Sequence, residues 1–208
     1  MAIKERALNG MTFLRNQIHS VIETGDKTVL NGVAVEINKA HNIYQGTLPT
    51  KVFPKYAKIY ESLFHAVQNA MKDNSHISKG ALSLCEELLE RIIRKTVAEE
   101  HFKKEIFFLP YQAAMWDSFE SVWKAAREDK ENCLPYVMPV PYADKNPDGS
   151  PSEWHCDRGR FPSYVPTLDW KQVDLKAIHP NVIYFHNFYD NQNLIISVDE
   201  RYYSSKEL

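Results

Sequence analysis

Apolar residues recur every three or four positions through the first hundred residues, and this spacing stops near Lys104. It places apolar side chains on one face of an α-helix, so each run predicts an amphipathic helix. Three such runs cover residues 30–44, 56–70 and 85–93, and they follow a first run made of Ile3, Ala7, Met11, Leu14, Ile18 and Val21. Four helices of this kind predict a bundle over residues 1–103.

The apolar stripes are close to a heptad repeat, which also favours a homodimer through these helices. The 208 residues are 44% hydrophobic, which is enough for one large domain or two small ones. A net charge of −2 without a basic stripe argues against nucleic-acid binding. No apolar run approaches the roughly 18 residues that cross a bilayer, and the N-terminus lacks a signal-peptide pattern. Three cysteines without a CxxC spacing favour a cytoplasmic location.

The pattern after Lys104 is that of an α/β domain. Apolar runs of strand length occupy residues 106–109, 136–140 and 182–185, and a helical pattern covers residues 117–127. The connections are long enough for crossovers, which predicts three parallel strands in one sheet over residues 104–208. Three strands are few for an open α/β sheet. We therefore expect this region to be part of a Rossmann-like domain of a longer protein.

The loop of residues 110–116 joins the first predicted strand to the predicted helix. The helix N-terminus offers backbone N–H groups that can bind a phosphate. Asp117 as the N-cap, with Glu120 three residues later, instead resembles a capping box and would occupy one of those donors. The loop has no glycine, so it is neither a Walker loop nor a dinucleotide fingerprint. The alternative to a phosphate site is a capped helix whose Trp116 packs on the sheet.

Residues 185–193 follow the third predicted strand and are rich in polar side chains. A histidine beside an aspartate can act as a general base, so His186 is a candidate base and Asp190 its orienting partner. Alternatively, the Asn and Asp residues cap the next helix and His186 is a buried, hydrogen-bonded imidazole. Both loops follow parallel strands, so Asp117, Ser118, His186, Asn187 and Asp190 are expected at one sheet edge. A carboxylate near His186 would favour its charged form.

The segment of residues 152–160 contains Glu153, His155, Cys156 and Asp157. These residue types bind zinc, but ligands so close in sequence cannot converge easily on one ion, and no second ligand pair has the usual spacing. The segment therefore predicts a surface loop with Trp154 tucked inward. We expect neither a metal nor a cofactor.

Three phrases, in order along the chain, resemble one known family. They are FLPYQAAMWDSFESVWKAA (residues 108–126), YVMPVPYADKNPDGS (136–150) and HPNVIYFHNFYDNQN (179–193). Together they are similar to the CDP-glycerol glycerophosphotransferase-like proteins of Gram-positive bacteria, which act in teichoic acid synthesis. The helical stretch VIETGDKTVLNGVAVEINKAHNIYQ (21–45) is also similar to the family. The resemblance covers most of the chain.

The resemblance implies a glycosyltransferase-B-like fold with two domains, of which this chain is the N-terminal, acceptor-side portion. The family's donor-binding half, with its histidine motifs, lies further along, so we expect this piece to be inactive alone. Its partners in the full-length protein would be CDP-glycerol and a polymer acceptor, and the missing part would allow association with the inner membrane face. The residues expected to act in catalysis are His186 and Asp190; those expected to bind substrate are Trp116, Asp117, Ser118, Glu120, Asn187, Tyr189 and Asn193.

A second hypothesis makes no use of catalysis. In it, the helical half is an interaction or dimerisation module, and the α/β half is an incomplete domain without activity. A third, a nucleotide- or sugar-sensing domain, would be revealed by thermal stabilisation on ligand binding.

Overall fold

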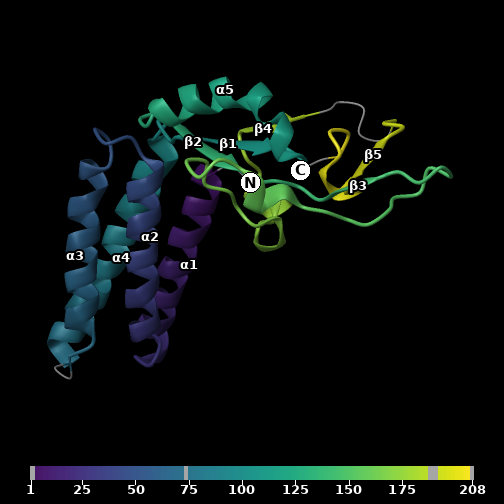
Figure 1. Ribbon diagram of the computed structural model, residues 1–208. Coiled ribbons are helices and arrows are strands. Elements are labelled where there is room, and N and C mark those ends of the chain that lie inside the picture. The colour runs from purple at the N-terminus through teal and green to yellow at the C-terminus, as the bar shows by residue number, and fades with distance from the viewer. Residues whose placement is uncertain (1–2, 73–74, 187–191, 207–208) are drawn as a thin grey trace. The chain divides into compact units, whose positions relative to one another are not determined.

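The computed structural model describes residues 3–72, 75–186 and 192–206 (Figure 1). The chain divides into two compact units. Residues 3–103 form the helical unit, and the α/β unit begins at Lys104. Within the described ranges, no helix combines the length and the apolar character needed to cross a membrane.

The helical unit consists of α1 (Ile3–Thr24), α2 (Leu30–Thr47), α3 (Pro54–Ala70) and α4 (Ser75–Ala98). The predicted four-helix pattern is confirmed, and residues 3–72 and 75–103 contain no strand. Each helix packs against two others, in the closed order α1–α2–α3–α4–α1. The apolar residues of the four sequence runs meet in one continuous core, in which Ile18, Leu30 and Leu63 are fully buried. The three-to-four spacing therefore predicted which faces are buried.

Three tyrosine rings lie in this core. Tyr44 packs against Tyr56 and Tyr60, with ring centroids 5.3 and 5.4 Å apart. The Tyr44 hydroxyl lies 2.8 Å from Oγ1 of Thr96, so its polar end is satisfied inside the bundle. Burial raises the pKa of Tyr44 to about 12, and it raises those of Tyr56 and Tyr60 as well. The bundle core therefore holds phenols that resist ionisation.

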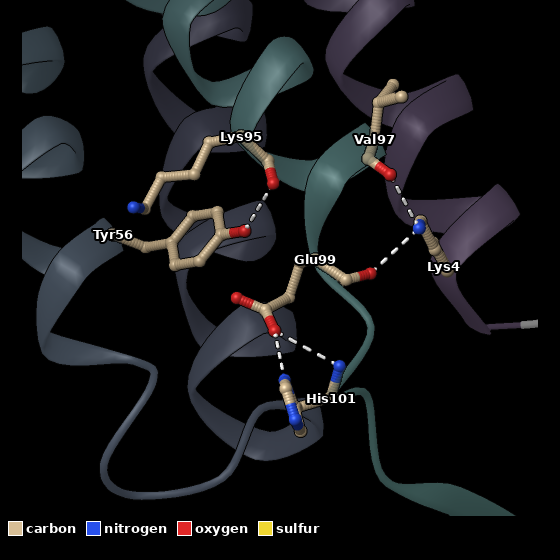
Figure 2. A network of polar contacts seen from close by, with 6 residues as sticks. All are labelled: Lys4, Tyr56, Lys95, Val97, Glu99 and His101. Carbon is tan, nitrogen blue, oxygen red and sulfur yellow. Dashed lines mark hydrogen bonds and ion pairs between the residues drawn. The ribbon is translucent and has the colours of Figure 1, made fainter.

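Polar contacts surround the carboxyl end of α4 (Figure 2). The Lys4 ammonium donates to the carbonyl oxygens of Val97 and Glu99, each at 2.7 Å. Burial would raise the pKa of Glu99, but hydrogen bonds from the side chain and backbone N–H of His101 outweigh it and hold that pKa below its usual value. The last carbonyls of a helix lack intrahelical partners, so a cation from α1 stabilises this end.

The α/β unit is built on a parallel sheet in the order β2–β1–β4. Its strands are β1 (Lys104–Leu109), β2 (Cys133–Val137) and β4 (Val182–Phe185). The predicted α/β class and the parallel pairing of the three strands are confirmed, and β1 is adjacent to both of the others. The second strand begins three residues earlier than predicted. It includes Pro135, which is tolerated because β2 is an edge strand.

The parallel sheet separates two small cores. On one side, α5 (Asp117–Glu128) packs with Phe108, Trp116, Trp123 and Val165. Figure 1 shows α5 lying along the sheet beside β1 and β2. On the other side, Phe107 packs with residues of the later segments, among them Leu175 from the short α6 (Leu175–Ile178). The alternation of Phe107 and Phe108 across the sheet follows from the two-residue period of a strand.

A second, smaller sheet joins β3 (Tyr142–Asp144) to β5 (Ile196–Val198) in antiparallel fashion. This pair of strands was not predicted from the sequence. Tyr142 also exchanges backbone hydrogen bonds with His155, at 3.0 and 2.7 Å. These contacts fold the segment around His155 onto β3.

Candidate functional site

The loops after β1 and β4 meet at the carboxyl edge of the parallel sheet. His186 follows β4 directly, and Tyr111 lies two residues after β1. Their rings are 5.2 Å apart and edge to face, and the His186 ring lies 5.3 Å from that of Phe119. Phe119 belongs to the first turn of α5, so three segments converge on the imidazole. Ligands of open α/β sheets bind at such an edge.

The surroundings of His186 differ from those expected. Its Nδ1 is buried and has no hydrogen-bond partner among the described residues. Burial lowers the pKa of His186, whereas the sequence analysis expected a carboxylate to favour the charged form. That expectation was wrong for the described residues because aromatic rings, not carboxylates, surround the imidazole. The other predicted residues of this loop, Asn187, Tyr189 and Asp190, lie outside the described residues.

The start of α5 is not the capping box that the sequence predicted. Trp116 occupies the N-cap position, no side chain caps the helix, and Asp117 is the first helical residue. A 3-10 turn at Ala113–Met115 runs directly into α5, which removes the sharp entry that an N-cap requires. The N–H groups of Phe119 and Glu120 donate to the Trp116 carbonyl. Two backbone N–H groups of the first turn of α5 therefore already have an acceptor, which leaves fewer donors for a phosphate.

The other predicted residues around the start of α5 differ in burial. Asp117 and Ser118 are exposed, and the Ser118 hydroxyl donates to the Met115 carbonyl. Trp116 is buried against Trp123 and Phe161, as the alternative reading of this loop predicted. Its indole N–H has no hydrogen-bond partner among the described residues.

Glu120 interacts with Tyr164 and Lys124. Its carboxylate accepts a hydrogen bond from the Tyr164 hydroxyl and lies 3.2 Å from the Lys124 ammonium. The Tyr164 hydroxyl is the main cause of its lowered pKa. The Trp116 indole N–H is near enough to contribute slightly, although it makes no hydrogen bond. Glu120 therefore ties α5 to the loop that contains Tyr164 through one of its two carboxylate oxygens.

Asn193 also has a structural role. Its Oδ1 accepts from the backbone N–H groups of Ile195 and Ile196, at 2.9 and 3.0 Å. Its carbonyl accepts from the Lys145 ammonium at 2.6 Å. Asn193 thus forms the turn that leads into β5, and these bonds leave its side chain engaged with the backbone.

A polar pocket lies beside the loop after β1, and the sequence analysis did not predict it. Its volume is about 340 Å³. We call it the Asp157 pocket; it is lined by Gln112, Tyr142, Asp144, His155, Cys156, Asp157 and Arg160. Tyr111 contacts both His186 and Tyr142, with the second pair of ring centroids 6.0 Å apart. The pocket and the imidazole therefore share a neighbouring aromatic residue.

Asp157 is the buried carboxylate of this pocket. It accepts from the Ala113 backbone N–H at 3.0 Å and from the Tyr142 hydroxyl at 3.3 Å, and Arg160 lies 3.4 Å away. The prediction that Trp154 is tucked inward was wrong, because its side chain is 47% exposed. Asp157 is buried instead. Its main partner lies 44 residues earlier, so no local spacing could have revealed it.

A larger cavity of about 710 Å³ lies by Trp170, Lys176 and Tyr202. It is a weaker candidate despite its size. Its Arg201 guanidinium already donates to Asp199 at 2.9 and 2.6 Å and lies over the Trp170 ring. The Asp157 pocket is the better candidate because it lies beside the loop that follows β1, where ligands of such sheets bind.

No three His, Cys, Asp or Glu side chains in the described ranges group together as a metal-binding set. No protein-family model, curated protein or solved structure matches this chain. Function therefore has to be argued from the site itself, because an α/β fold hosts many unrelated activities.

Proposed function

We propose that this chain is the acceptor-side portion of a transferase that moves glycerol phosphate from CDP-glycerol to a hydroxyl of a cell-wall polymer. One observation carries the proposal: His186 lies at the carboxyl edge of the sheet with a lowered pKa. A neutral imidazole at this edge can accept a proton, and the lowered pKa keeps it neutral but makes it a weaker base. The resemblance of the three sequence phrases to glycerophosphotransferase-like proteins supplies the reaction class.

In the proposed reaction, an acceptor hydroxyl attacks the glycerol-bearing phosphorus of CDP-glycerol. A new oxygen–phosphorus bond forms, the bond to the bridging oxygen of CMP breaks, and CMP leaves. His186 takes the proton of the attacking hydroxyl. Such transfers depend mainly on positioning and on stabilising charge at the phosphoryl oxygens. The proposal assigns donor binding to a part of the protein outside this chain, so it gives this unit the acceptor and the base.

The test uses the protein expressed from the complete gene, with CMP release from CDP-glycerol as the readout. Replacing His186 with Gln is expected to lower kcat by about 10²–10⁴-fold, the usual contribution of a general base. His65→Gln is the matched control, because His65 is exposed on α3 and a glutamine suits a helix there. Equal turnover in His186→Gln and wild type would refute the assignment of the base.

The pH profile gives a second readout. Because the His186 pKa is lowered, kcat/KM should rise with pH through a pKa below the ordinary histidine value of about 6.5. This rising limb should be absent in His186→Gln and present in His65→Gln. A profile unchanged by His186→Gln would assign the limb to another group.

A second candidate function is the helical interaction module. Phe13 of α1 and Val35 and Ile43 of α2 are 56%, 54% and 52% exposed, and association of two helical units would bury apolar surface of this kind. Sedimentation equilibrium tests this directly. A dimer that dissociates in the Val35→Lys, Ile43→Lys double variant would support the module, whereas a monomer at all concentrations would remove it.

A further inference from the structure

We infer that the Asp157 pocket holds a neutral, hydroxyl-rich unit, a sugar alcohol or a monosaccharide, rather than a phosphate. The inference rests on the proposed function in so far as this unit would be the acceptor that presents its hydroxyl to the base. It goes beyond that proposal by naming the residues that hold the unit and by excluding an anion from the pocket.

The walls of the pocket are held in place before any ligand binds. Asp157 connects its own 3-10 turn to the loop after β1 through the Ala113 N–H, and to β3 through the Tyr142 hydroxyl. The backbone bridge between Tyr142 and His155 fixes a second wall. These bonds come from three separate segments of the α/β unit. A pocket held in this way loses little conformational entropy when a ligand binds, which raises affinity.

The side chains that face the pocket match hydroxyl groups. The Asp144 carboxylate accepts hydrogen bonds from hydroxyls, and the Gln112 amide, which also interacts with the Tyr142 hydroxyl, both donates and accepts. Arg160 has a side chain that is 76% exposed and one long contact, to Asp157 at 3.4 Å. Among the described residues, most of its five N–H donors therefore have no partner and can meet hydroxyl oxygens. Alternating donors and acceptors of this kind are complementary to the neighbouring hydroxyls of a polyol.

Charge and size exclude other ligands. The pocket holds two carboxylates, Asp144 and Asp157, against one guanidinium, Arg160. A phosphate would meet like charge there and would be disfavoured. The volume of about 340 Å³ lies at the lower end of the range of ~300–1,000 Å³ for ligand pockets. A single sugar or sugar alcohol fits this volume better than a nucleotide does.

The test is a titration of the 208-residue chain, labelled with ¹⁵N, with ribitol, glucose or inorganic phosphate. Backbone amide shifts report where each probe binds. We expect ribitol or glucose to shift the amides of Gln112, Tyr142 and His155 at concentrations up to roughly 100 mM, since a few hydrogen bonds give millimolar affinity. Inorganic phosphate should leave these amides unmoved.

Two variants locate the contacts. Gln112→Ala and Asp144→Ala should each weaken binding about fivefold, as expected for one lost hydrogen bond. Glu153→Ala is the matched control: it lies on the same segment as His155, is exposed and does not line the pocket, so it should bind as wild type does. Absence of shifts with both neutral probes would overturn the inference. Phosphate shifts at these amides, or equal binding by all variants, would also do so.

Failure of this inference and failure of the proposed function are distinguishable. In one outcome, His186→Gln abolishes turnover while Asp144→Ala and Gln112→Ala leave the acceptor KM unchanged. This result would support the proposed transferase activity and would overturn the assignment of the pocket to the acceptor. In the other outcome, the 208-residue chain binds ribitol or glucose in the pocket while the complete protein releases no CMP. This result would support the pocket assignment and would overturn the proposed transferase activity.

Discussion

The two units of this chain bury their polar groups in different ways. In the helical unit, buried polar groups such as Tyr44 and Thr96 are paired within the bundle. The α/β unit contains the two buried side-chain nitrogens that lack a partner among the described residues, Trp116 Nε1 and His186 Nδ1. Buried unpaired polar atoms are costly, and native proteins retain them mainly where function requires them. The α/β unit is therefore the better candidate to hold a functional site.

The hydrophobic cores of the two units also differ. The helical unit has one continuous core from four helices, whereas the α/β unit has two small cores on either side of a three-stranded sheet. A continuous core makes the first unit tolerant of polar changes at its surface and sensitive to cavities. In the second unit, individual polar bonds such as those of Asp157 hold the loops that form the site.

The largest expected effect is a cavity in the helical core. Ile18 is 0% exposed and Ile22, one turn later on α1, is 40% exposed. Ile18→Ala should cost ~2–5 kcal/mol of unfolding free energy, and Ile22→Ala less than about 1 kcal/mol. Denaturation followed by far-UV circular dichroism measures the difference, because most of the helix lies in this unit. Equal losses in the two variants would contradict the assignment of the buried face.

The same experiment tests whether the units unfold separately. All four tryptophans, Trp116, Trp123, Trp154 and Trp170, lie in the α/β unit. Tryptophan fluorescence therefore reports that unit alone. Ile18→Ala should move the dichroism transition and leave the fluorescence transition in place. A joint shift of both transitions would show that the two units unfold as one.

The second effect concerns the buried carboxylate of the α/β unit. Asp157→Ala leaves the Ala113 N–H and the Tyr142 hydroxyl without their acceptor, at a cost of ~1–3 kcal/mol. The fluorescence transition should move to lower denaturant, and the dichroism transition should not. Glu153→Ala, an exposed change on the same segment, should leave both in place. No shift in Asp157→Ala would mean that these bonds do not hold the loops.

The sequence correctly predicted the helices and strands whose positions follow from the spacing of apolar residues. The spacing of Ile18, Leu30 and their counterparts specified four helices, and the short apolar runs specified three parallel strands. These predictions need only the helix and strand periods, because the buried faces follow directly from them. Parallel topology also predicts that the loops after β1 and β4 emerge at the same edge.

The site was harder to predict because its contacts are distant in sequence. Asp157 is explained by an N–H donor 44 residues away, and Tyr142 is placed by pairing with β5. The error at Asp117 was of another kind. Its neighbours matched a capping motif, but the chain enters α5 from a 3-10 turn, and the Trp116 carbonyl accepts from the Phe119 and Glu120 N–H groups without a side-chain cap. A local capping motif can therefore predict a side-chain cap where the preceding turn already leads the chain into the helix.

The third effect is a loss of stability at high pH in the helical unit. Tyr44 has a pKa of about 12 in the folded chain and about 10 when unfolded. Above pH 10 the unfolded state releases its proton first, so stability falls as pH rises toward 12. For Tyr44 this amounts to ~1.4 kcal/mol by pH 11. Tyr44→Phe should flatten the decline in dichroism midpoint between pH 9 and 11; an unchanged slope would contradict it.

The α/β unit should respond at the opposite end of the pH scale. Because the His186 pKa is lowered on folding, the unfolded state binds its proton first as pH falls below about 6.5. The contribution of His186 to stability is present above that pH and is lost as pH falls toward the folded pKa. The fluorescence midpoint should therefore fall more steeply with acid in wild type than in His186→Gln. Equal slopes would mean that His186 titrates alike in both states.

The smallest expected effect lies in the contacts drawn in Figure 2. Lys4→Met removes the donors to the Val97 and Glu99 carbonyls while keeping a residue of similar helix propensity. A cation at a helix carboxyl end typically contributes ~0.3–1 kcal/mol. Lys39→Met is the control: its surface pair with Glu36, on one helix, is worth ~0–0.5 kcal/mol.

Salt separates the two lysines further. Charge interactions at the surface weaken as the Debye length shrinks from about 8 Å at physiological ionic strength to about 3 Å at 1 M. The Lys4 ammonium makes two short hydrogen bonds to carbonyls, and such bonds keep part of their strength in salt. Lys4→Met should therefore still lower the dichroism midpoint in 1 M salt, where Lys39→Met should have no effect. If salt abolishes both effects alike, Lys4 acts through charge alone and not as a donor to the end of α4.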